Sequence, residues 1–259
     1  MTFKTIAGDF PDQETALNEL KDPKYRKILY EENLKLTKKD IKGSVKDDLL
    51  IIQSIRSLQD IDKAANMLSK RIREWYEYYN PEVSRAIGDH DTFVEAILKG
   101  QEKQEESMGA DLAQEDIESI LSLAKKASSL YEEKRFQEDY IKKKMEKICP
   151  NMLAITGALI GAKLLDHSGS LKHLSELPAS TIQLLGAEAA LFRHITTGAK
   201  CPKYGVLINH PLVQDQKPKM KGKAARALAD KISIATKIDH FKGEFIGDKL
   251  YEQVKKRFK

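Results

Sequence analysis

The sequence has 259 residues, of which 41% are hydrophobic and 32% charged, so it can bury at least one core and still be rich in surface charge. Its longest uncharged apolar run, residues 152–162, has 11 residues, too few to cross a bilayer, which needs about 20. The N-terminus lacks the apolar core of a secretory signal, and Cys149 and Cys201 have no metal-type spacing. We therefore expect an intracellular protein without a membrane span or disulfide bonds.

The net charge of +5 is unevenly distributed along the chain. Residues 146–259 contain 19 Lys and Arg against 10 Asp and Glu, a net charge of +9. Residues 1–145 contain 25 against 29, a net charge of −4. This asymmetry predicts two functional regions, of which the second faces a polyanion and the first faces protein.

Two long amphipathic helices are predicted in the first half of the chain. Apolar residues recur at intervals of three and four over residues 47–79, and Asn80-Pro81 ends the pattern because proline cannot continue a helix. A similar pattern covers residues 114–148 and ends at Cys149-Pro150. The 34 residues between the two patterns include a shorter predicted helix at 91–105. The equal lengths of the two long helices favour an antiparallel hairpin.

The C-terminal half predicts shorter helices. Residues 152–165 are expected to form one helix, in which Gly157 and Gly161 lie four apart and allow another helix to pack closely. Glycine and proline punctuate residues 197–211, and strand-like alternation is confined to residues 204–209. The predicted fold class is therefore mainly α. Further helices are expected at residues 180–195, 221–239 and 247–258.

Catalysis finds no support in the motifs. The six histidines form no metal-binding arrangement with cysteines or carboxylates, and no glycine loop of the P-loop or dinucleotide type occurs. Cys201 follows His194 by seven residues, but this spacing does not establish that a nucleophile meets a base. We predict that the protein is not an enzyme and has no catalytic residue, metal ion or cofactor.

Residues 178–213 hold the densest set of binding-type side chains. Within them lies a first cationic group, in which cations that seek phosphate stand beside a ring that can stack on a base. A second cationic group follows it. Any single lysine is more simply explained as solvated surface, but the two groups together, in the half with a charge of +9, favour nucleic-acid binding. The first group is Arg193, His194, Lys200, Lys203 and Tyr204; the second is Lys217, Lys219, Lys221, Lys223 and Arg226.

Two ordered motifs stand out in this half, GAEAALFRH at residues 186–194 and KGKAARALADK at residues 221–231. With the residues around them they closely resemble the Nop domain, in particular that of the archaeal Nop protein of box C/D small ribonucleoproteins. Upstream, residues 49–83 resemble the coiled-coil segment of this family, with its REWY signature at residues 73–76. The resemblance covers about residues 45–259. It departs where the family often has a double glycine, here Ser168-Gly169-Ser170-Leu171, and at Cys201.

The resemblance implies a scaffold with three parts. Residues 46–148 would form a coiled-coil hairpin that pairs two protomers, and residues 149–259 an all-α Nop domain that binds a kink-turn guide RNA already occupied by a small ribosomal-protein-like partner. Residues 1–45 correspond to the remnant of a domain that binds fibrillarin, the methyltransferase that 2′-O-methylates rRNA or tRNA. We expect a short or truncated form of that domain, and two alternatives stay open for Phe3, Ile6 and Phe10: the remains of a docking strand or a mobile tail. The implied location is the cytoplasm of an archaeal cell or the nucleolus of a eukaryotic one.

Site residues follow from the resemblance by their positions in its motifs. Leu191 and Phe192, which lie between them, are expected to belong to the core. The residues expected to contact RNA are Gly169, Leu171, Lys172, Arg193, Lys200, Lys203, Tyr204, Lys223 and Arg226. The residues expected to face the partner protein are Gln183, Gly186, Ala187 and Glu188, where Gly186 and Ala187 permit close approach.

Several alternatives stay open at this stage. The splicing-factor branch of the same family binds a spliceosomal RNA stem, and an enzyme acting on RNA is a hypothesis from another class. For the hairpin, we expect a homodimer or a heterodimer with a paralogue, because the adjacent apolar pairs Leu49-Leu50 and Ile51-Ile52 make its face broad. Packing of these residues on the chain's own C-terminal domain is the alternative.

Overall fold

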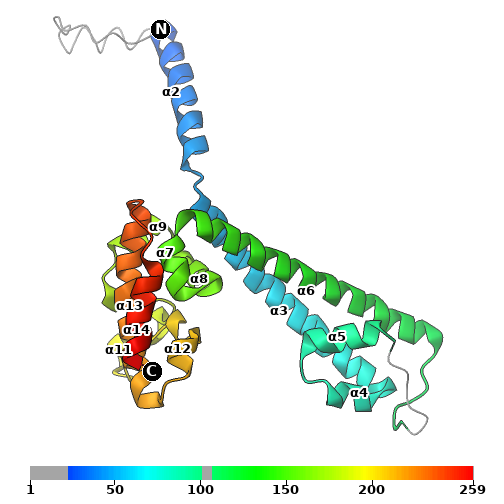
Figure 1. The fold of residues 1–259 in the computed structure, drawn as a ribbon. Helices are drawn as coiled ribbons and strands as arrows, with labels where there is room; N and C mark the ends of the chain where they lie inside the picture. The colour runs from blue at the N-terminus through cyan, green and yellow to red at the C-terminus, as the bar shows by residue number, and fades with distance from the viewer. Residues whose placement is uncertain (1–22, 101–106, 259) are drawn as a thin grey trace, which may run out of the picture. The chain divides into compact units, whose positions relative to one another are not determined.

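The computed structural model describes residues 23–100 and 107–258, and Figure 1 shows their fold. These residues contain helices and no strand, which confirms the predicted mainly α class. The chain divides into two compact units, Met1–Lys46 and Asp47–Lys259. None of the described helices combines the length and the apolar character that a membrane crossing requires.

The first unit contains a helix that the sequence patterns did not predict, α2 (Pro23–Ser44). Large apolar side chains of this helix are exposed, among them Tyr30 at 66% and Ile41 at 61%. The docking residues expected at Phe3, Ile6 and Phe10 lie outside the described residues.

The second unit begins with the predicted hairpin. Its helices α3 (Asp47–Tyr79) and α6 (Gln114–Ile148) have the bounds that the sequence predicts. Cross-helix contacts show that they run antiparallel, because the residue number on α6 falls as that on α3 rises (Figure 1). These contacts are Asp47 with Lys144, Ser54 with Gln137, Asp62 with Lys134 and Ser69 with Tyr131, at 2.6 to 2.9 Å.

Two short helices, α4 (Pro81–Ala86) and α5 (His90–Leu98), follow α3. The helix expected at 91–105 thus ends at Leu98 as described, and residues 101–106 lie outside the description. Arg73 of the REWY signature donates to the carbonyl oxygens of Ser84 and Ile87, and its guanidinium carbon lies 4.1 Å from the centre of the Phe93 ring. This signature arginine therefore stabilises the hairpin at the junction with α4 and α5.

The C-terminal domain surrounds one long helix, α13 (Pro218–His240), which packs against most of its other helices. The remaining elements are α7 (Pro150–Thr156), α8 (Ala158–Ser168), α9 (Leu171–Glu176), α10 (Ala179–Leu184), α11 (Glu188–Thr197), the 3₁₀ helix η1 (Val206–Asn209), α12 (Pro211–Gln214) and α14 (Gly247–Phe258).

Three predictions of local structure in this domain are wrong. The single helix expected at 152–165 is two helices, because Gly157 has a left-handed φ of 73° and separates α7 from α8. The helix expected at 180–195 is likewise broken between α10 and α11, where Gly186 has a φ of 85°. The strand considered at 204–209 is absent, and Val206–Asn209 form a 3₁₀ helix instead. Close packing, expected at both glycines, is confirmed only at Gly161, where a Cβ would lie 2.6 Å from the Met145 Cε atom; nothing lies within 4 Å of a Cβ at Gly157.

A buried carboxylate and a buried imidazole hold α7 in place. Asp239 accepts hydrogen bonds from the backbone N–H groups of Asn151 and Met152, at 3.0 and 2.9 Å, and so satisfies the start of α7. Burial raises the pKa of Asp239, and these hydrogen bonds partly offset the rise. His210 bonds the Ile155 carbonyl oxygen through Nε2 at 3.0 Å and accepts the Leu212 N–H at Nδ1.

The base of the hairpin shares its core with the C-terminal helices. Ile51 and Ile52 are buried in the same apolar cluster as residues of α13, so for this pair packing within the chain is the observed arrangement. Leu49 and Leu50 are 40% and 37% exposed and remain open to other contacts. The Asp48 carboxylate accepts the Leu171 N–H at 3.1 Å, which joins the hairpin to the start of α9.

Candidate nucleic-acid interface

The helix that carries Arg193 and His194 of the first cationic group, α11, has no buried residue. Phe192 is 68% exposed and Ile195 is 72% exposed, whereas Leu191 is half-buried. The expectation that Phe192 belongs to the core is therefore wrong. Because the chain turns at Gly186, α11 is a separate helix from α10. It does not extend the side of α10 that is buried at Ile182. The outcome is an exposed surface that is both apolar and basic.

The members of the first cationic group have different surroundings. Arg193, Lys200 and Lys203 are exposed, as phosphate-binding residues need to be. Tyr204 is half-buried and packs against the core. The His194 ring bonds the Ala199 carbonyl oxygen through Nδ1, so this histidine closes the turn after α11. Three cations of this group are thus free to meet a ligand, while the histidine has a structural contact.

The two cationic groups meet where Lys203 lies against α13. A Cβ added to Gly222 would lie 3.5 Å from the Lys203 Cβ and 3.7 Å from its Cδ, so the lysine stem packs over this glycine. Gln183 holds the contact, because its Nε2 atom lies 2.6 Å from the Lys203 carbonyl oxygen and 3.4 Å from that of Gly222. Lys203 consequently lies beside Lys221 and Lys223 of the second group.

The convergence of these cations is not balanced by acids. Within residues 23–100 and 107–258, no carboxylate forms an ion pair with any cation of the two groups. Like charges held close together repel, so folding alone gives no reason for this arrangement. A polyanionic ligand such as a nucleic-acid backbone would supply the missing negative charge.

The residues expected to face a partner protein bracket the turn between α10 and α11. Gly186 is exposed, and a Cβ there would lie 2.5 Å from the Val206 Cγ2 atom, so only glycine fits this turn. Glu188 accepts the Gly186 N–H at 2.7 Å and lies 3.3 Å from His167 Nδ1. Burial raises the pKa of Glu188, but these backbone and histidine contacts outweigh it, so the net shift is downward. Ala187 is half-buried at the start of α11, and Gln183 precedes the turn.

Gly169, Leu171 and Lys172, which are also expected to contact RNA, lie around the start of α9, and two of these three residues are exposed. Gly169 ends α8 in the left-handed conformation, with a φ of 80°, and is exposed, as is Lys172. Leu171, in contrast, is 6% exposed and its N–H is bonded to Asp48. Its side chain belongs to the core, so we remove Leu171 from the residues proposed to contact RNA.

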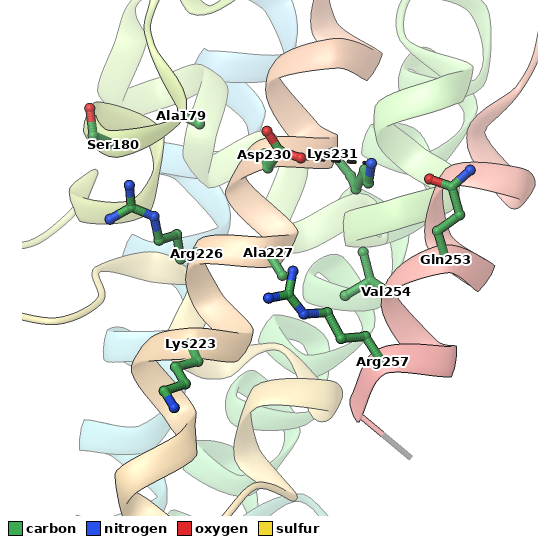
Figure 2. A pocket seen from close by; sticks show the side chains of 10 residues that line it. All are labelled: Ala179, Ser180, Lys223, Arg226, Ala227, Asp230, Lys231, Gln253, Val254 and Arg257. Atoms are coloured by element: carbon green, nitrogen blue, oxygen red, sulfur yellow. Dashed lines mark ion pairs between the residues drawn. The ribbon is translucent and has the colours of Figure 1, made fainter.

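A hollow of about 470 Å³ lies beside the second cationic group, between α10, α13 and α14 (Figure 2). Lys223 and Arg226 line it together with Arg257 of α14. We call it the basic hollow. The motifs did not indicate Arg257, because it lies on another helix and its neighbours Lys255 and Lys256 look alike in sequence. No group of three or more potential metal ligands occurs among the residues described.

Comparisons with known proteins agree on one family. The Nop family model, described as "snoRNA binding domain, fibrillarin", matches residues 57–107 and 99–259. An uncharacterized NOP5 family protein of Methanocaldococcus jannaschii is 37% identical over 257 residues, which cover 90% of this chain and 62% of that protein. Human nucleolar protein 56 is 38% identical over 240 residues, covering 81% of this chain and 40% of that protein.

A structural likeness supports the same assignment. A chain in a crystal structure of a fibrillarin/Nop5p complex is similar with a TM-score of 0.55 and 29% identity, covering 97% of this chain and 86% of that one. The chain spans less than two thirds of the length of the Methanocaldococcus jannaschii protein and of human nucleolar protein 56. From the family match and the identities to these relatives, we conclude that the chain belongs to the Nop family of snoRNA-binding proteins.

Proposed function

We propose that the chain is a core scaffold of a box C/D guide ribonucleoprotein, which directs 2′-O-methylation of rRNA or tRNA. The observation that carries this proposal is the convergence of the two cationic groups at the contact of Lys203 with Gly222, without balancing carboxylates. In a member of the Nop family, this convergence is suited to a guide RNA.

The proposed surface is a composite of RNA-binding and protein-binding parts. Exposed Phe192 and Ile195 lie next to Arg193 on α11, so apolar and cationic surfaces adjoin. Large exposed apolar side chains are typical of contacts with protein or with stacked bases rather than with phosphates. The RNA side consists of Gly169, Lys172, Arg193, Lys200, Lys203, Tyr204, Lys223 and Arg226, and the side facing the small ribosomal-protein-like partner consists of Gln183, Gly186, Ala187 and Glu188.

A composite surface has a thermodynamic consequence. Neither the RNA nor the partner alone covers it, so we expect the chain to bind strongly only to the kink-turn RNA already occupied by the partner protein. The deciding measurement is a gel shift of the chain with a box C/D kink-turn RNA, with and without that protein. If the partner makes no difference to the affinity, the composite site is wrong.

The electrostatic part of the proposal has its own measurement. If about four to six phosphates are held, the logarithm of the affinity falls with the logarithm of the salt concentration at a slope of roughly −3 to −5. A flat response would remove the two cationic groups from the proposed interface, even if the partner protein still mattered.

The proposal assigns fibrillarin to the first unit. The exposed apolar side chains of α2, including Tyr30 and Ile41, form a surface of the kind that partners cover. The likeness to a chain of a fibrillarin/Nop5p complex covers 97% of this chain, so it includes most of α2. A pull-down with fibrillarin, comparing the chain with an Ile41→Glu variant, should show reduced capture by the variant, whereas Lys42→Glu should retain it.

We further propose that the hairpin pairs two copies of the chain. Exposed Leu49 and Leu50 at its base, and Met67 at 67% exposure along α3, are the apolar residues that a second copy would cover. Light scattering should give twice the mass of one chain. If the chain is a monomer at micromolar concentration, the proposed pairing is wrong. The broad apolar face of the hairpin would then be explained by the packing of Ile51 and Ile52 within the chain.

A further inference from the structure

The basic hollow is built from three helices that are far apart in sequence. Its lining includes Ser180 at the start of α10, Lys223, Arg226 and Ala227 of α13, and Arg257 of α14. Figure 2 shows the Arg257 side chain extending from α14 toward α13, so that cations reach the hollow from two sides. On α13, Lys223 lies three residues before Arg226 and four before Ala227, so its side chain is on the same side of the helix as each of them.

The charge inside the hollow is strongly positive. Lys223, Arg226 and Arg257 have no ion pair with any carboxylate of the described residues. The lining includes one carboxylate, Asp230, and its Oδ2 atom lies 3.7 Å from the Nζ atom of Lys231, which also lines the hollow. The charges of Asp230 and Lys231 therefore offset each other. The charges of Lys223, Arg226 and Arg257 remain for an anion from outside the chain.

The shape of the hollow suits an anion with polar neighbours. Ala227 on α13 carries a short side chain, which leaves the space between the longer cationic side chains open. Ser180 adds a hydroxyl that can donate to or accept from a ligand. The guanidinium groups of Arg226 and Arg257 can each donate two parallel hydrogen bonds to the oxygens of a phosphate.

The hollow also continues the surface described above. Lys223 lines it and is adjacent in sequence to Gly222, over which the Lys203 stem packs. A polymer of phosphates bound at Lys203 can therefore extend into the hollow along α13, whereas a free anion would gain nothing from Lys203. This continuity favours a nucleic-acid strand as the source of the phosphate.

We propose that the basic hollow binds a backbone phosphate of the guide RNA and that Arg257 is a specific contact to it. The proposal rests on the RNA-binding function proposed above and extends the interface to α14. It places one stretch of RNA backbone over Lys203 and then over Lys223, Arg226 and Arg257.

The test compares two neighbouring cations of α14. Arg257 lines the hollow, whereas Lys256 is exposed and is not part of the lining. Affinity for the kink-turn RNA with its bound partner protein should fall about fivefold to tenfold in Arg257→Gln, and the salt slope should become shallower by about 1. In Lys256→Gln both quantities should stay close to those of the parent protein. Arg257→Lys should restore the slope and only part of the affinity, because lysine lacks the planar fork.

A second measurement identifies the phosphate itself. Neutral methylphosphonate linkages are introduced one at a time into the RNA, and each is tested against the parent protein and Arg257→Gln. We expect one linkage at which neutralisation weakens RNA binding by the parent protein. The same linkage should have little further effect on RNA binding by Arg257→Gln, because the variant has already lost the contact. Thermal unfolding followed by circular dichroism controls for folding.

The outcomes separate this inference from the function on which it rests. If the parent protein binds the RNA complex and Arg257→Gln behaves like Lys256→Gln, the hollow is not a phosphate site, although the scaffold function stands. If every neutral linkage lowers the RNA affinity of Arg257→Gln as much as that of the parent protein, Arg257 contacts no particular phosphate and the inference is likewise overturned. If the parent protein fails to bind the RNA complex at all, both proposals are wrong.

Discussion

The hairpin and the C-terminal domain use their cations in opposite ways. In the hairpin, Lys144 lies 2.6 Å from Asp47, Lys134 lies 2.6 Å from Asp62 and Arg135 lies 3.2 Å from Asp91, so that each pair joins two different helices. In the C-terminal domain, the cations around Gly222 and in the basic hollow lack carboxylate partners among the described residues. In the hairpin, the cross-helix ion pairs stabilise the fold, whereas the clustered cations of the C-terminal domain are those that we propose to contact RNA.

The C-terminal domain depends for its stability on a buried carboxylate, Asp239, rather than on its cations. Replacing Asp239 by Ala leaves the N–H groups of Asn151 and Met152 unbonded in the core. We expect the free energy of unfolding to fall by about 3 kcal/mol. Asp230→Ala on the exposed face of the same helix should change it by less than about 0.5 kcal/mol. Urea unfolding measures both, and equal losses would contradict the structural role of Asp239.

Arg73 tests whether a cation of the hairpin serves folding alone. Arg73→Ala removes donors to the Ser84 and Ile87 carbonyl oxygens and a stacking contact with Phe93. The expected loss of stability is about 2 kcal/mol, with no change in RNA affinity. Arg71→Ala, which removes only an exposed pair with Glu74 on the same helix, should cost no more than about 0.5 kcal/mol. An RNA-binding defect in folded Arg73→Ala would show that this cation does not serve folding alone.

A crossed pair of lysine substitutions tests the comparison directly. Lys203→Gln should weaken RNA binding about tenfold and make the salt slope shallower by about 1, without loss of stability. Lys134→Gln should do the reverse, because it removes the cross-helix pair with Asp62: stability should fall by no more than about 1 kcal/mol, with RNA affinity unchanged. Gel shifts and urea unfolding of both variants give the four values. The comparison is wrong if either substitution affects both properties equally.

A pH effect of smaller size should come from His210. Burial lowers the pKa of this imidazole from its ordinary 6.5, although its bond to the Ile155 carbonyl oxygen raises it and Lys255 lowers it further. Because the unfolded chain then takes up a proton before the folded chain does, stability is retained above about pH 6.5 and is lost as the pH falls toward the lowered value. Between about pH 7 and pH 6 we expect a loss of no more than about 0.7 kcal/mol in urea unfolding, the upper limit for a single group whose unfolded pKa is 6.5. His210→Gln should flatten this dependence, and an unchanged slope would exclude His210 as its cause.

The two long helices of the hairpin could be predicted from the sequence with their observed bounds. Over residues 47–79 and most of 114–148 apolar residues recur at intervals of three and four, and Asn80-Pro81 and Cys149-Pro150 end the two patterns because proline cannot continue a helix. The C-terminal breaks were missed because glycine within an apolar repeat is compatible both with helix and with a left-handed turn. At Gly186 the close approach of Val206, twenty residues later in the chain, selects the turn.

The candidate site can be predicted only in part, because contacts between residues far apart in sequence decide which of its members come together. Lys203 and Lys223 stand out as members of dense local motifs, but their approach to one another depends on the Gly222 contact and on Gln183, which are tertiary. An apolar residue between motif residues, such as Phe192, is expected in the core, but α11 has no buried residue and Phe192 is exposed. Arg257 carries no local signal, since only the packing of α14 against α13 distinguishes it from Lys256.

The amide of Gln183 sets how the complex responds to its surroundings. It ties the Lys203 and Gly222 carbonyl oxygens with neutral hydrogen bonds, so the spacing of the cations does not depend on ionic attraction. Concentrated salt should therefore detach a bound RNA while the protein keeps its folded form. After dilution the same surface should bind another nucleic-acid strand without refolding of the protein.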